Sequence, residues 1–266
     1  MGDMSTRRFE PRPHHRRITV LSGAGLSAAA GLATFRGPGG IWDRDPDLEA
    51  AMQADRLPES LPVLWRVWGG VFTQAVAAGP TRGHRAIAAM EATVLTQNVD
   101  ELHQQAGSQA VAELHGSAAR AECVGRQCDW RMRLDLRGGE QHPVDTPMHY
   151  GAPAACPDCG AAVRPAIVLF GEQLPADALH AADRATQNCD LFIAVGTSNT
   201  VAPASLLAPA ARRAGATTVC IDPYADREHL AGIFDHVIEA DAHEVLGEWA
   251  QLRQRENRNP FLDPFG

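Results

Sequence analysis

The stretch Arg17-Ile-Thr-Val-Leu-Ser-Gly-Ala-Gly-Leu-Ser-Ala28 decides the fold of this chain. Its first six residues are rich in β-branched and apolar side chains and predict a strand over residues 17–22. Gly23-Ala-Gly-Leu-Ser-Ala28 follows at once and fits the pattern G-x-G-x-x-[G/A], in which a strand turns into a helix and the backbone approaches a pyrophosphate. The sequence therefore predicts a dinucleotide-binding turn that leads into a helix over residues 26–33. The alternative for this pattern alone is a tight strand–helix turn without a ligand.

Strands and helices are predicted to alternate along most of the remaining chain. Further strands are expected over residues 93–96, 111–114, 166–170, 190–195, 217–221 and 236–239. Helices are expected over residues 47–78, with interruptions at Pro58 and Pro62, and over 82–90, 177–187, 203–214 and 242–253. This alternation predicts an α/β fold with a doubly wound, mostly parallel sheet that helices cover on both faces.

Two segments do not follow the alternation and predict a second, smaller domain. Residues 120–164 are rich in cysteine, glycine and proline and lack helical periodicity, so they are expected to form an inserted zinc-binding module. We expect a small domain made of this module and a helical insertion over 45–80. A Rossmann-like domain is expected to comprise residues 17–44, 81–119 and 165–256, between a disordered basic tail (1–16) and a C-terminal tail (257–266).

Composition limits the class of protein. The chain has 266 residues, 45% of them hydrophobic, and a net charge of −8. No apolar run approaches the ~18 residues of a membrane span, and the basic N-terminus lacks the apolar core of a secretory signal. Basic residues form no long block, which argues against duplex nucleic acid as the main partner. We therefore expect a cytoplasmic protein that does not bind a membrane and shows no strong signal for nucleic acid.

Four of the six cysteines have the spacing of a metal site. Cys123-x4-Cys128 is followed, after 27 intervening residues, by Cys156-x2-Cys159. Zinc favours four thiolates in a closed tetrahedron, and such a site stabilises a segment with few apolar residues. The spacing predicts one structural zinc ion. The alternatives are two disulfides or unpaired thiols; His142 and His149 lie between the pairs, but four cysteines already complete the coordination shell.

His115 is the candidate general base. It lies in Glu113-Leu-His-Gly-Ser117, at the end of an apolar segment and after the polar stretch Gln97-Asn-Val-Asp100. Imidazole has an ordinary pKa near about 6.5 and is the side chain best suited to accept a proton at neutral pH. The alternative for this residue alone is a surface histidine with no catalytic role.

A dehydrogenase is the first rival that the glycine turn suggests. Such an enzyme needs an acidic residue about 20 residues after the turn, at the end of a second strand, to bind the ribose hydroxyls. That position falls near Asp43, inside a loop over residues 35–42 and beyond that is rich in glycine, proline and tryptophan. Nucleotide binding remains predicted, whereas hydride transfer is disfavoured.

Six motifs in order resemble the sirtuins, a family of NAD-dependent protein-lysine deacylases, in their bacterial type. They are Gly23-Ala-Gly-Leu-Ser27 with Ala33-Thr-Phe-Arg-Gly37 and Gly40-Ile-Trp42, Thr96-Gln-Asn-Val-Asp-Glu-Leu-His103, Glu113-Leu-His-Gly116, the two cysteine pairs, Arg164-Pro-Ala-Ile-Val-Leu-Phe-Gly-Glu172 and Val195-Gly-Thr-Ser198. The resemblance runs from about residue 17 to about residue 250. It implies transfer of an acyl group from lysine to ADP-ribose with release of nicotinamide, and acyl-lysine proteins or peptides as partners.

The resemblance also implies roles for individual residues. His115 and Asn98 would be catalytic, and the four cysteines would hold a zinc ion that does not touch the substrate. The residues implied to bind NAD are Gly23, Ala24, Gly25, Ser27, Ala28, Thr34, Phe35, Arg36, Trp42, Gln97, Asn98, Asp100, Gly196, Thr197, Ser198, Asp222 and Ala242. Those implied to bind the substrate are Val168, Leu169, Phe170, Gly171 and Trp68; residues 168–171 would pair with the peptide as a strand edge.

The preferred acyl group is expected to be neutral. Relatives that prefer succinyl- or malonyl-lysine carry a Tyr-x-x-Arg pair that binds the distal carboxylate. Trp68 and Val71 occupy those two positions here, so the bidentate donor that a buried carboxylate requires is missing. Arg66 could replace it only if the helix register differed by several residues.

The sequence leaves three alternative functions open. Protein mono-ADP-ribosyl transfer or NAD hydrolysis would use the same site with a different nucleophile. A zinc module that senses NAD without turnover would need no base at position 115. A dehydrogenase would change the absorbance of the nicotinamide ring.

Overall fold

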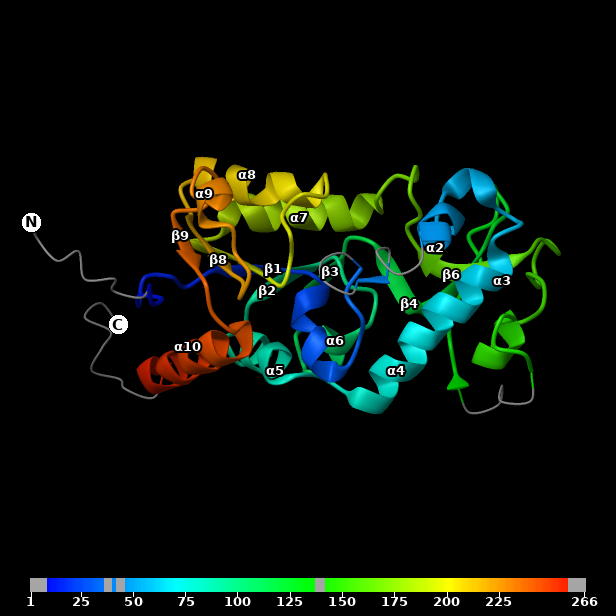
Figure 1. Cartoon of the computed structure of the whole chain (residues 1–266), viewed down its shortest axis with the longest axis horizontal. Helices are drawn as coiled ribbons and strands as arrows, with labels where there is room; N and C mark the ends of the chain where they lie inside the picture. Colours follow the sequence, from blue (N-terminus) through cyan, green and yellow to red (C-terminus); the bar gives the residue numbers. More distant parts are fainter. Residues whose placement is uncertain (1–8, 36–39, 42–45, 137–141, 258–266) are drawn as a thin grey trace, which may run out of the picture.

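The main body is a six-stranded parallel sheet with helices on both faces (Figure 1). The computed structural model describes residues 9–35, 40–41, 46–136 and 142–257. Strand order is β3-β2-β1-β7-β8-β9. The strands are β1 (Ile18–Ser22), β2 (Thr93–Thr96), β3 (Val111–Glu113), β7 (Leu191–Val195), β8 (Thr217–Ile221) and β9 (His236–Ile238). The predicted α/β, doubly wound fold is confirmed, and these six strands agree with the sequence prediction to within a residue at each end.

Alternate residues of each buried strand pack against opposite helical layers. Val20 of β1 belongs to a core with α5 (Arg82–Ala89) and α10 (Ala242–Asn257). Leu21 belongs to the opposite core with α7 (Ala176–Asn188) and α8 (Leu207–Arg213), which follows the short turn η7 (Ala204–Leu206). Because both faces are buried, the strands consist of nearly continuous apolar runs. The sequence prediction missed α6 (Leu102–Gln105) and α9 (Arg227–Leu230), which are too short to show a helical period.

The helix predicted over residues 26–33 is wrong. Two separate 3-10 turns, η1 (Ala24–Leu26) and η2 (Ala28–Ala30), take its place. The N–H of Gly25 donates to the carbonyl of Gly196 at 2.9 Å, which ties this segment to the loop after β7. Gly31 then adopts a left-handed φ of 82° and ends the second turn. Contacts with a distant loop thus override the helix propensity of the alanine run.

The helical insertion is confirmed in outline. It comprises α2 (Pro46–Ala51), η3 (Ala54–Arg56), α3 (Leu61–Leu64), the π-turn η4 (Trp65–Gly69) and α4 (Gly70–Ala78). Pro58 lies in a break, whereas Pro62 lies in the first turn of α3, where its missing N–H would have no helical partner. Gly69 is required because a Cβ there would overlap the Tyr150 ring, while Gly70 faces open space.

The small unit also contains a three-stranded antiparallel sheet, in the order β5-β4-β6. Its strands are β4 (Gly116–Cys123), β5 (Arg131–Arg133) and β6 (Val163–Ile167), and η6 (Pro147–Tyr150) lies between the last two. The strand predicted over 166–170 begins at 163 and pairs with β4, so it does not continue the parallel sheet. Alternate residues of β6 are buried, which is typical of an antiparallel strand with one covered face. The predicted domain boundaries remain a prediction.

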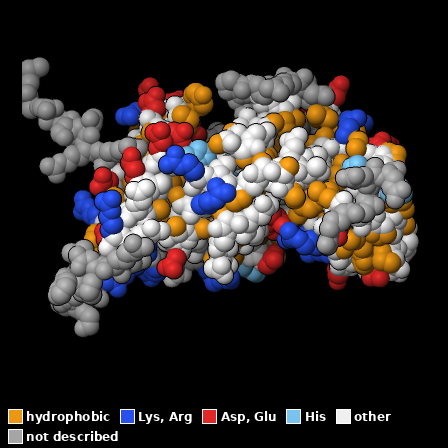
Figure 2. Space-filling view, turned by 90° about the horizontal axis from the view of Figure 1, so that it is seen from below, with side chains coloured by type: hydrophobic (Ala, Val, Ile, Leu, Met, Phe, Trp, Pro, Cys, Tyr) orange, Lys and Arg blue, Asp and Glu red, His pale blue; other side chains and the backbone are white. Residues whose placement is uncertain are grey.

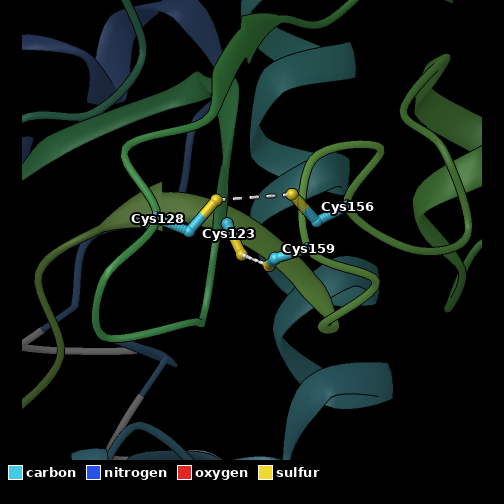
Figure 3. Close-up of side chains that lie close together, drawn as sticks. All are labelled: Cys123, Cys128, Cys156 and Cys159. Atoms are coloured by element: carbon cyan, nitrogen blue, oxygen red, sulfur yellow. Dashed lines mark hydrogen bonds between the residues drawn. The ribbon is translucent and has the colours of Figure 1, made fainter.

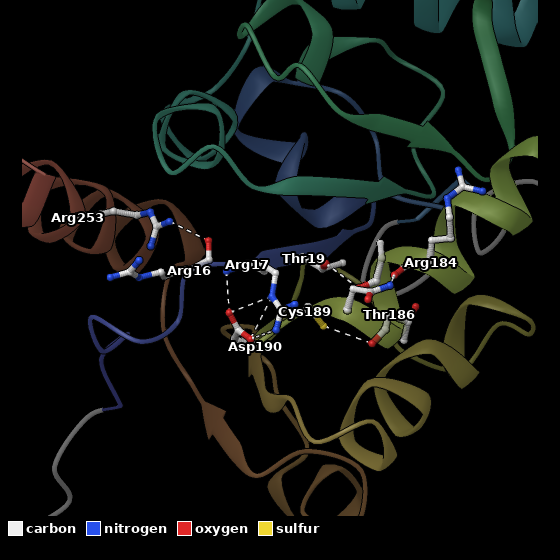
Figure 4. Close-up of polar contacts among 10 residues, drawn as sticks. Arg16, Arg17, Thr19, Arg184, Thr186, Cys189, Asp190 and Arg253 are labelled. Carbon is white, nitrogen blue, oxygen red and sulfur yellow. Dashed lines mark hydrogen bonds and ion pairs between the residues drawn. The ribbon is translucent and has the colours of Figure 1, made fainter. Parts of the chain in front are cut away.

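Residues 9–16, which the sequence analysis assigns to the N-terminal tail, contact α10. The Phe9 ring lies edge-on to Trp249 of α10, with centroids 5.7 Å apart. The Arg253 side chain donates to the carbonyl of Arg16 at 3.0 Å, as Figure 4 shows. Arg17 then pairs with Asp190 at 2.6 Å, which joins the starts of β1 and β7 and lowers the pKa of Asp190 to about 2.

The surface seen from below carries acidic and basic side chains interspersed (Figure 2). Within the described parts of the chain, none of the helices has the length and apolarity to span a bilayer.

Candidate functional site

The cleft lies where the strand order reverses. β1 lies between β2 and β7, and ligands of open parallel sheets bind beyond the strand ends at such a switch point. Gly23 follows β1 and Gly196 follows β7, and both line a cavity of about 1610 Å³. This volume exceeds the ~300–1000 Å³ of common ligand pockets, so the cleft has room for a dinucleotide and a second substrate.

Most of the predicted site residues line this one cleft. They are Gly23, Ala24, Gly25, Ala28, Thr34, Phe35, Gln97, Asn98, His115, Gly196, Thr197, Ser198, Asp222 and Ala242, together with Trp68, Val168, Leu169, Phe170 and Gly171. Arg36 and Trp42 lie outside the described residues. Ser27 and Asp100 do not line the cleft itself but line a small hollow of about 20 Å³ that shares Ala24, Phe35 and Asn98 with it.

The glycines of the turn are needed for packing between two loops. A Cβ on Gly23 would lie 2.6 Å from the carbonyl oxygen of Gly196, and one on Gly25 would lie 2.8 Å from its Cα. The N–H groups of Gly23 and Gly25 donate to the carbonyls of Val195 and Gly196. Two N–H groups that the sequence pattern offered to a pyrophosphate are therefore already bonded within the protein.

Ser27 and Asp100 hold Asn98 in place. The Ser27 hydroxyl donates to the Asp100 carboxylate at 2.6 Å, and the two residues are only 2% and 4% exposed. The Asn98 amide donates to Ser27 Oγ at 3.1 Å and to the carbonyl of Gly23 at 3.0 Å. Ser27 therefore orients the Asn98 side chain, and Asp100 in turn fixes the Ser27 hydroxyl.

His115 has the geometry of a neutral base. Its Nδ1 lies 3.0 Å from the carbonyl oxygen of Gln97. Because a carbonyl only accepts, Nδ1 carries the proton and Nε2 keeps its lone pair. Burial lowers the pKa of His115 below its ordinary 6.5, and the bond to Gln97 acts in the opposite direction. The ring on the cleft wall is thus held uncharged at neutral pH.

This lowered pKa predicts the pH dependence of turnover. A general base works only when deprotonated, so kcat/KM should stay on its plateau as the pH falls to about 6.5 and decrease only below it. A pH–rate profile between about pH 5 and 8 measures this. An acid limb centred above 6.5 in folded protein would contradict the prediction.

The same profile needs a stability control. Burial lowers the pKa of His84 to about 2 and that of His103 to about 4. The unfolded chain binds these protons below about pH 6.5, whereas the folded chain binds them only below the lowered values. Stability is therefore present above pH 6.5 and is lost as the pH falls toward 4, so melting temperature must be recorded at each pH.

One end of the cleft is apolar. The Trp68 indole N–H donates to the Met52 sulfur at 3.2 Å, and the Phe35 ring lies 5.5 Å from that of Trp68. The indole N–H is therefore occupied. Among the described residues that line the cleft, none is a lysine or an arginine.

The Val168–Gly171 segment is partly paired within the protein. The Phe170 N–H donates to the Met52 carbonyl at 2.9 Å, and the Ala54 N–H donates to the Phe170 carbonyl at 3.0 Å. The Val168 N–H donates to the His115 carbonyl at 2.9 Å. The backbone of Phe170 is thus already bonded to the helical insertion, although its side chain reaches the cleft.

The opposite end of the cleft is polar and includes residues that the sequence reasoning missed. Asp222 follows β8, and desolvation raises the pKa of its carboxyl. Tyr224 is 86% exposed beside it, and its N–H donates to Asp222 Oδ1 at 2.8 Å. Asp241, which follows β9, also lines the cleft. The rule that ligands gather beyond the carboxyl ends of parallel strands would have identified both missed residues.

The four predicted zinc ligands converge (Figure 3). All four Sγ atoms lie within 4.8 Å of one another; Cys123 and Cys159 are 3.4 Å apart, and Cys128 and Cys156 are 3.6 Å apart. Disulfide sulfurs would be about 2.05 Å apart. A tetrahedron with Zn–S bonds of about 2.3 Å has edges near 3.8 Å, so the cluster fits a zinc ion. His149 is instead bonded through Nδ1 to the carbonyl of His142.

Comparison with known proteins agrees with this geometry. The family model described as Sir2 matches residues 23–203. NAD-dependent protein deacylase 2 of Pyrobaculum aerophilum is 40% identical over 251 residues, which cover 91% of this chain and 93% of the relative. The NAD-dependent protein deacetylase of Chromobacterium violaceum is 37% identical, over 85% of this chain and 88% of its own.

A solved structure has the same fold. It is a Sir2 mutant in complex with a deacetylated p53 peptide and 3'-O-acetyl ADP-ribose. Its TM-score is 0.73 at 30% identity, and the match covers 91% of this chain and 93% of that one.

Proposed function

This chain belongs to the Sir2 family and is an NAD-dependent protein deacylase, and we propose that His115 is the general base of its reaction. One observation supports this role above the others. The bond from Nδ1 to the Gln97 carbonyl leaves Nε2 unprotonated on the wall of the cleft. A base there can accept a proton from a sugar hydroxyl without first losing its own.

Bound NAD supplies ADP-ribose as the acyl acceptor and releases nicotinamide. The cleft residues suit NAD, because the same cleft contains the partly desolvated Asp222 carboxylate and an apolar region at Trp68. We assign the adenine ribose to Asp222, whose carboxylate can accept hydrogen bonds from the ribose hydroxyls. Asn98, fixed by Ser27 and the Gly23 carbonyl, is assigned to the ribose near His115.

The acyl-lysine of a protein or peptide is the proposed second substrate. The Sir2 structure with a deacetylated peptide supports this, because its fold places a peptide and an acetylated ADP-ribose in one complex. The Phe170 side chain, 37% exposed at the cleft, is proposed to contact the peptide and Trp68 to contact the acyl group. A zinc site needs its four thiols in the reduced form, and thiols stay reduced in the cytosol. We therefore propose the cytosol as the location.

Mass spectrometry of an acetyl-lysine peptide incubated with NAD tests the function. We expect equal amounts of free lysine peptide, nicotinamide and O-acetyl-ADP-ribose, and none of these products without NAD. The sequence contains 24 arginines and no lysine, so the enzyme itself cannot contribute an acyl-lysine. ADP-ribose attached to protein, or free ADP-ribose with intact acetyl peptide, would instead identify a transferase or an NAD hydrolase.

The apolar end of the cleft predicts a preference for neutral acyl groups. We expect kcat/KM for an acetylated lysine to exceed that for the same lysine succinylated by about 100-fold. An unpaired buried carboxylate costs about 3 kcal/mol or more, and 1.4 kcal/mol corresponds to a factor of ten. Equal or faster removal of succinyl would contradict the assignment of Trp68 to this end.

A further inference from the structure

Glu101 is a buried carboxylate at a strained backbone position beside the site. Its side chain is 4% exposed, and its φ and ψ are 58° and 17°, in the left-handed region that favours glycine. It directly follows the loop that carries Asn98 and Asp100. Non-glycine residues keep such a conformation only where surrounding contacts fix it.

Three donors fix this carboxylate, and all come from the small antiparallel sheet. The Ser117 hydroxyl donates to Oε1 at 2.9 Å, and Arg133 donates to Oε2 at 2.5 Å. Arg120 lies 3.5 Å from Oε1 and also pairs with Glu113. Glu113 and Ser117 lie two residues before and two residues after His115, so these contacts bracket the base on both sides.

Other hydrogen bonds also join the two loops at this point, among them one from the Leu114 N–H to the Thr96 carbonyl at 2.8 Å. The ring of His115 bonds to the Gln97 carbonyl, and the N–H of Ala118 donates to the Val99 carbonyl at 2.8 Å. Glu101 is therefore covalently continuous with the Asn98 loop and hydrogen-bonded to the His115 loop. A shift in either loop would have to break charge-assisted bonds to a carboxylate that is itself buried, although the Arg120 and Arg133 side chains are partly exposed.

We propose that Glu101 is a positioning residue, which holds His115 and Asn98 at their working separation and links both to β5 through Arg133. This proposal rests on the proposed role of His115 as the base. It does not require Glu101 to touch either substrate. It predicts that the loss of the carboxylate affects the chemical step more than the binding of NAD, because misplacement of a catalytic group by about 1 Å can cost about 100-fold in rate.

The chain offers a matched control at Glu91. Glu91 also has a left-handed backbone, with a φ of 55°, but it is exposed at the end of α5. Glycine relieves the same backbone strain at either position. Only the change at 101 also removes the carboxylate from Ser117, Arg120 and Arg133.

The test compares Glu101→Gly with Glu91→Gly in the full-length enzyme. Glu91→Gly should melt at or above the wild-type temperature, whereas Glu101→Gly, which also loses the bonds to Ser117, Arg120 and Arg133, should remain folded but melt lower. Glu101→Gly should lose at least about tenfold in kcat, with the KM for NAD within about twofold of wild type. The acid limb of its pH profile should move to higher pH, because a loosened His115 is better solvated. Glu91→Gly should match wild type in all three measurements.

Wild-type kcat and an unshifted pH profile in folded Glu101→Gly would overturn the proposal. If Glu101→Gly does not fold, Ser117→Ala decides, since it removes one hydroxyl and leaves the carboxylate in place. A fall in kcat with a shifted acid limb would support the proposal, and unchanged kinetics would refute it. Failure of the base assignment is recognised separately, by full activity of an alanine variant at His115.

Discussion

Replacing His115 by alanine should lower kcat for deacylation by about 10²- to 10⁴-fold, the usual contribution of a general base. The ring is bonded to the Gln97 carbonyl and lines the cleft, so its loss removes the proton acceptor without removing Asn98 or the glycine turn. We therefore expect NAD affinity to change little. Single-turnover product formation and calorimetric titration with NAD measure the two effects separately.

A histidine that plays no part in the cleft provides the control. His180 is exposed on α7 and does not line the cavity, so His180→Ala should retain the wild-type rate. Full deacylation by His115→Ala would refute the assignment of the base. Loss of folding in His115→Ala, seen as a lowered melting temperature, would be detected before any rate was compared.

Removing the zinc should unfold the small unit. Structural zinc contributes about 10–16 kcal/mol in zinc-finger peptides, which is as large as the total stability of many domains. The cysteines connect the end of β4 to a loop before β6, and Cys123 and Cys156 belong to the core that also contains Trp65 and Tyr150. We expect Cys156→Ser to bind less than one equivalent of zinc and to lose the cooperative melting of this core.

The matched control is Cys189→Ser. Cys189 is also buried, but its Sγ donates to the Thr186 carbonyl, a bond that a serine hydroxyl can replace. This variant should keep one zinc per chain and most of the wild-type stability. Zinc measured by a chromogenic chelator, together with thermal melting, distinguishes the variants. A Cys156→Ser protein with a full equivalent of zinc and wild-type melting would show that the cluster does not support the fold.

Local patterns were sufficient for the parallel sheet and for the residues with the most distinctive chemistry. A strand buried on both faces leaves a nearly continuous apolar run, which is why the six strands could be located. The zinc ligands follow from the spacing of two cysteine pairs, since each pair lies on one short turn. The sequence makes His115 the candidate base because imidazole accepts a proton at neutral pH and the residue ends an apolar segment after the polar stretch 97–100.

Predictions failed where contacts between distant segments decide the local structure. Residues 26–33 have the composition of a helix, but the bond between Gly25 and Gly196 imposes 3-10 turns. The sequence pattern places β6 in the parallel sheet, because the sequence of a strand does not show which other strand it pairs with. In the structure β6 pairs with β4. The hydrogen bonds that link Ser27 to Asp100 and to Asn98 likewise depend on segments about 70 residues apart, so the sequence does not indicate them.

The amino-acid sequence by itself determined the strands of the main sheet, the four thiols that suit a zinc ion and the chemical type of the side chains proposed for catalysis, because each depends on neighbours a few residues away. Only the tertiary structure decided three further points. It fixes which nitrogen of His115 carries the proton, makes the Met52 sulfur the acceptor of the Trp68 indole N–H, and brings three donors to the Glu101 carboxylate. Each of these depends on a hydrogen bond between residues 16 or more positions apart, whose geometry arises only when the sheets and the helical insertion pack together.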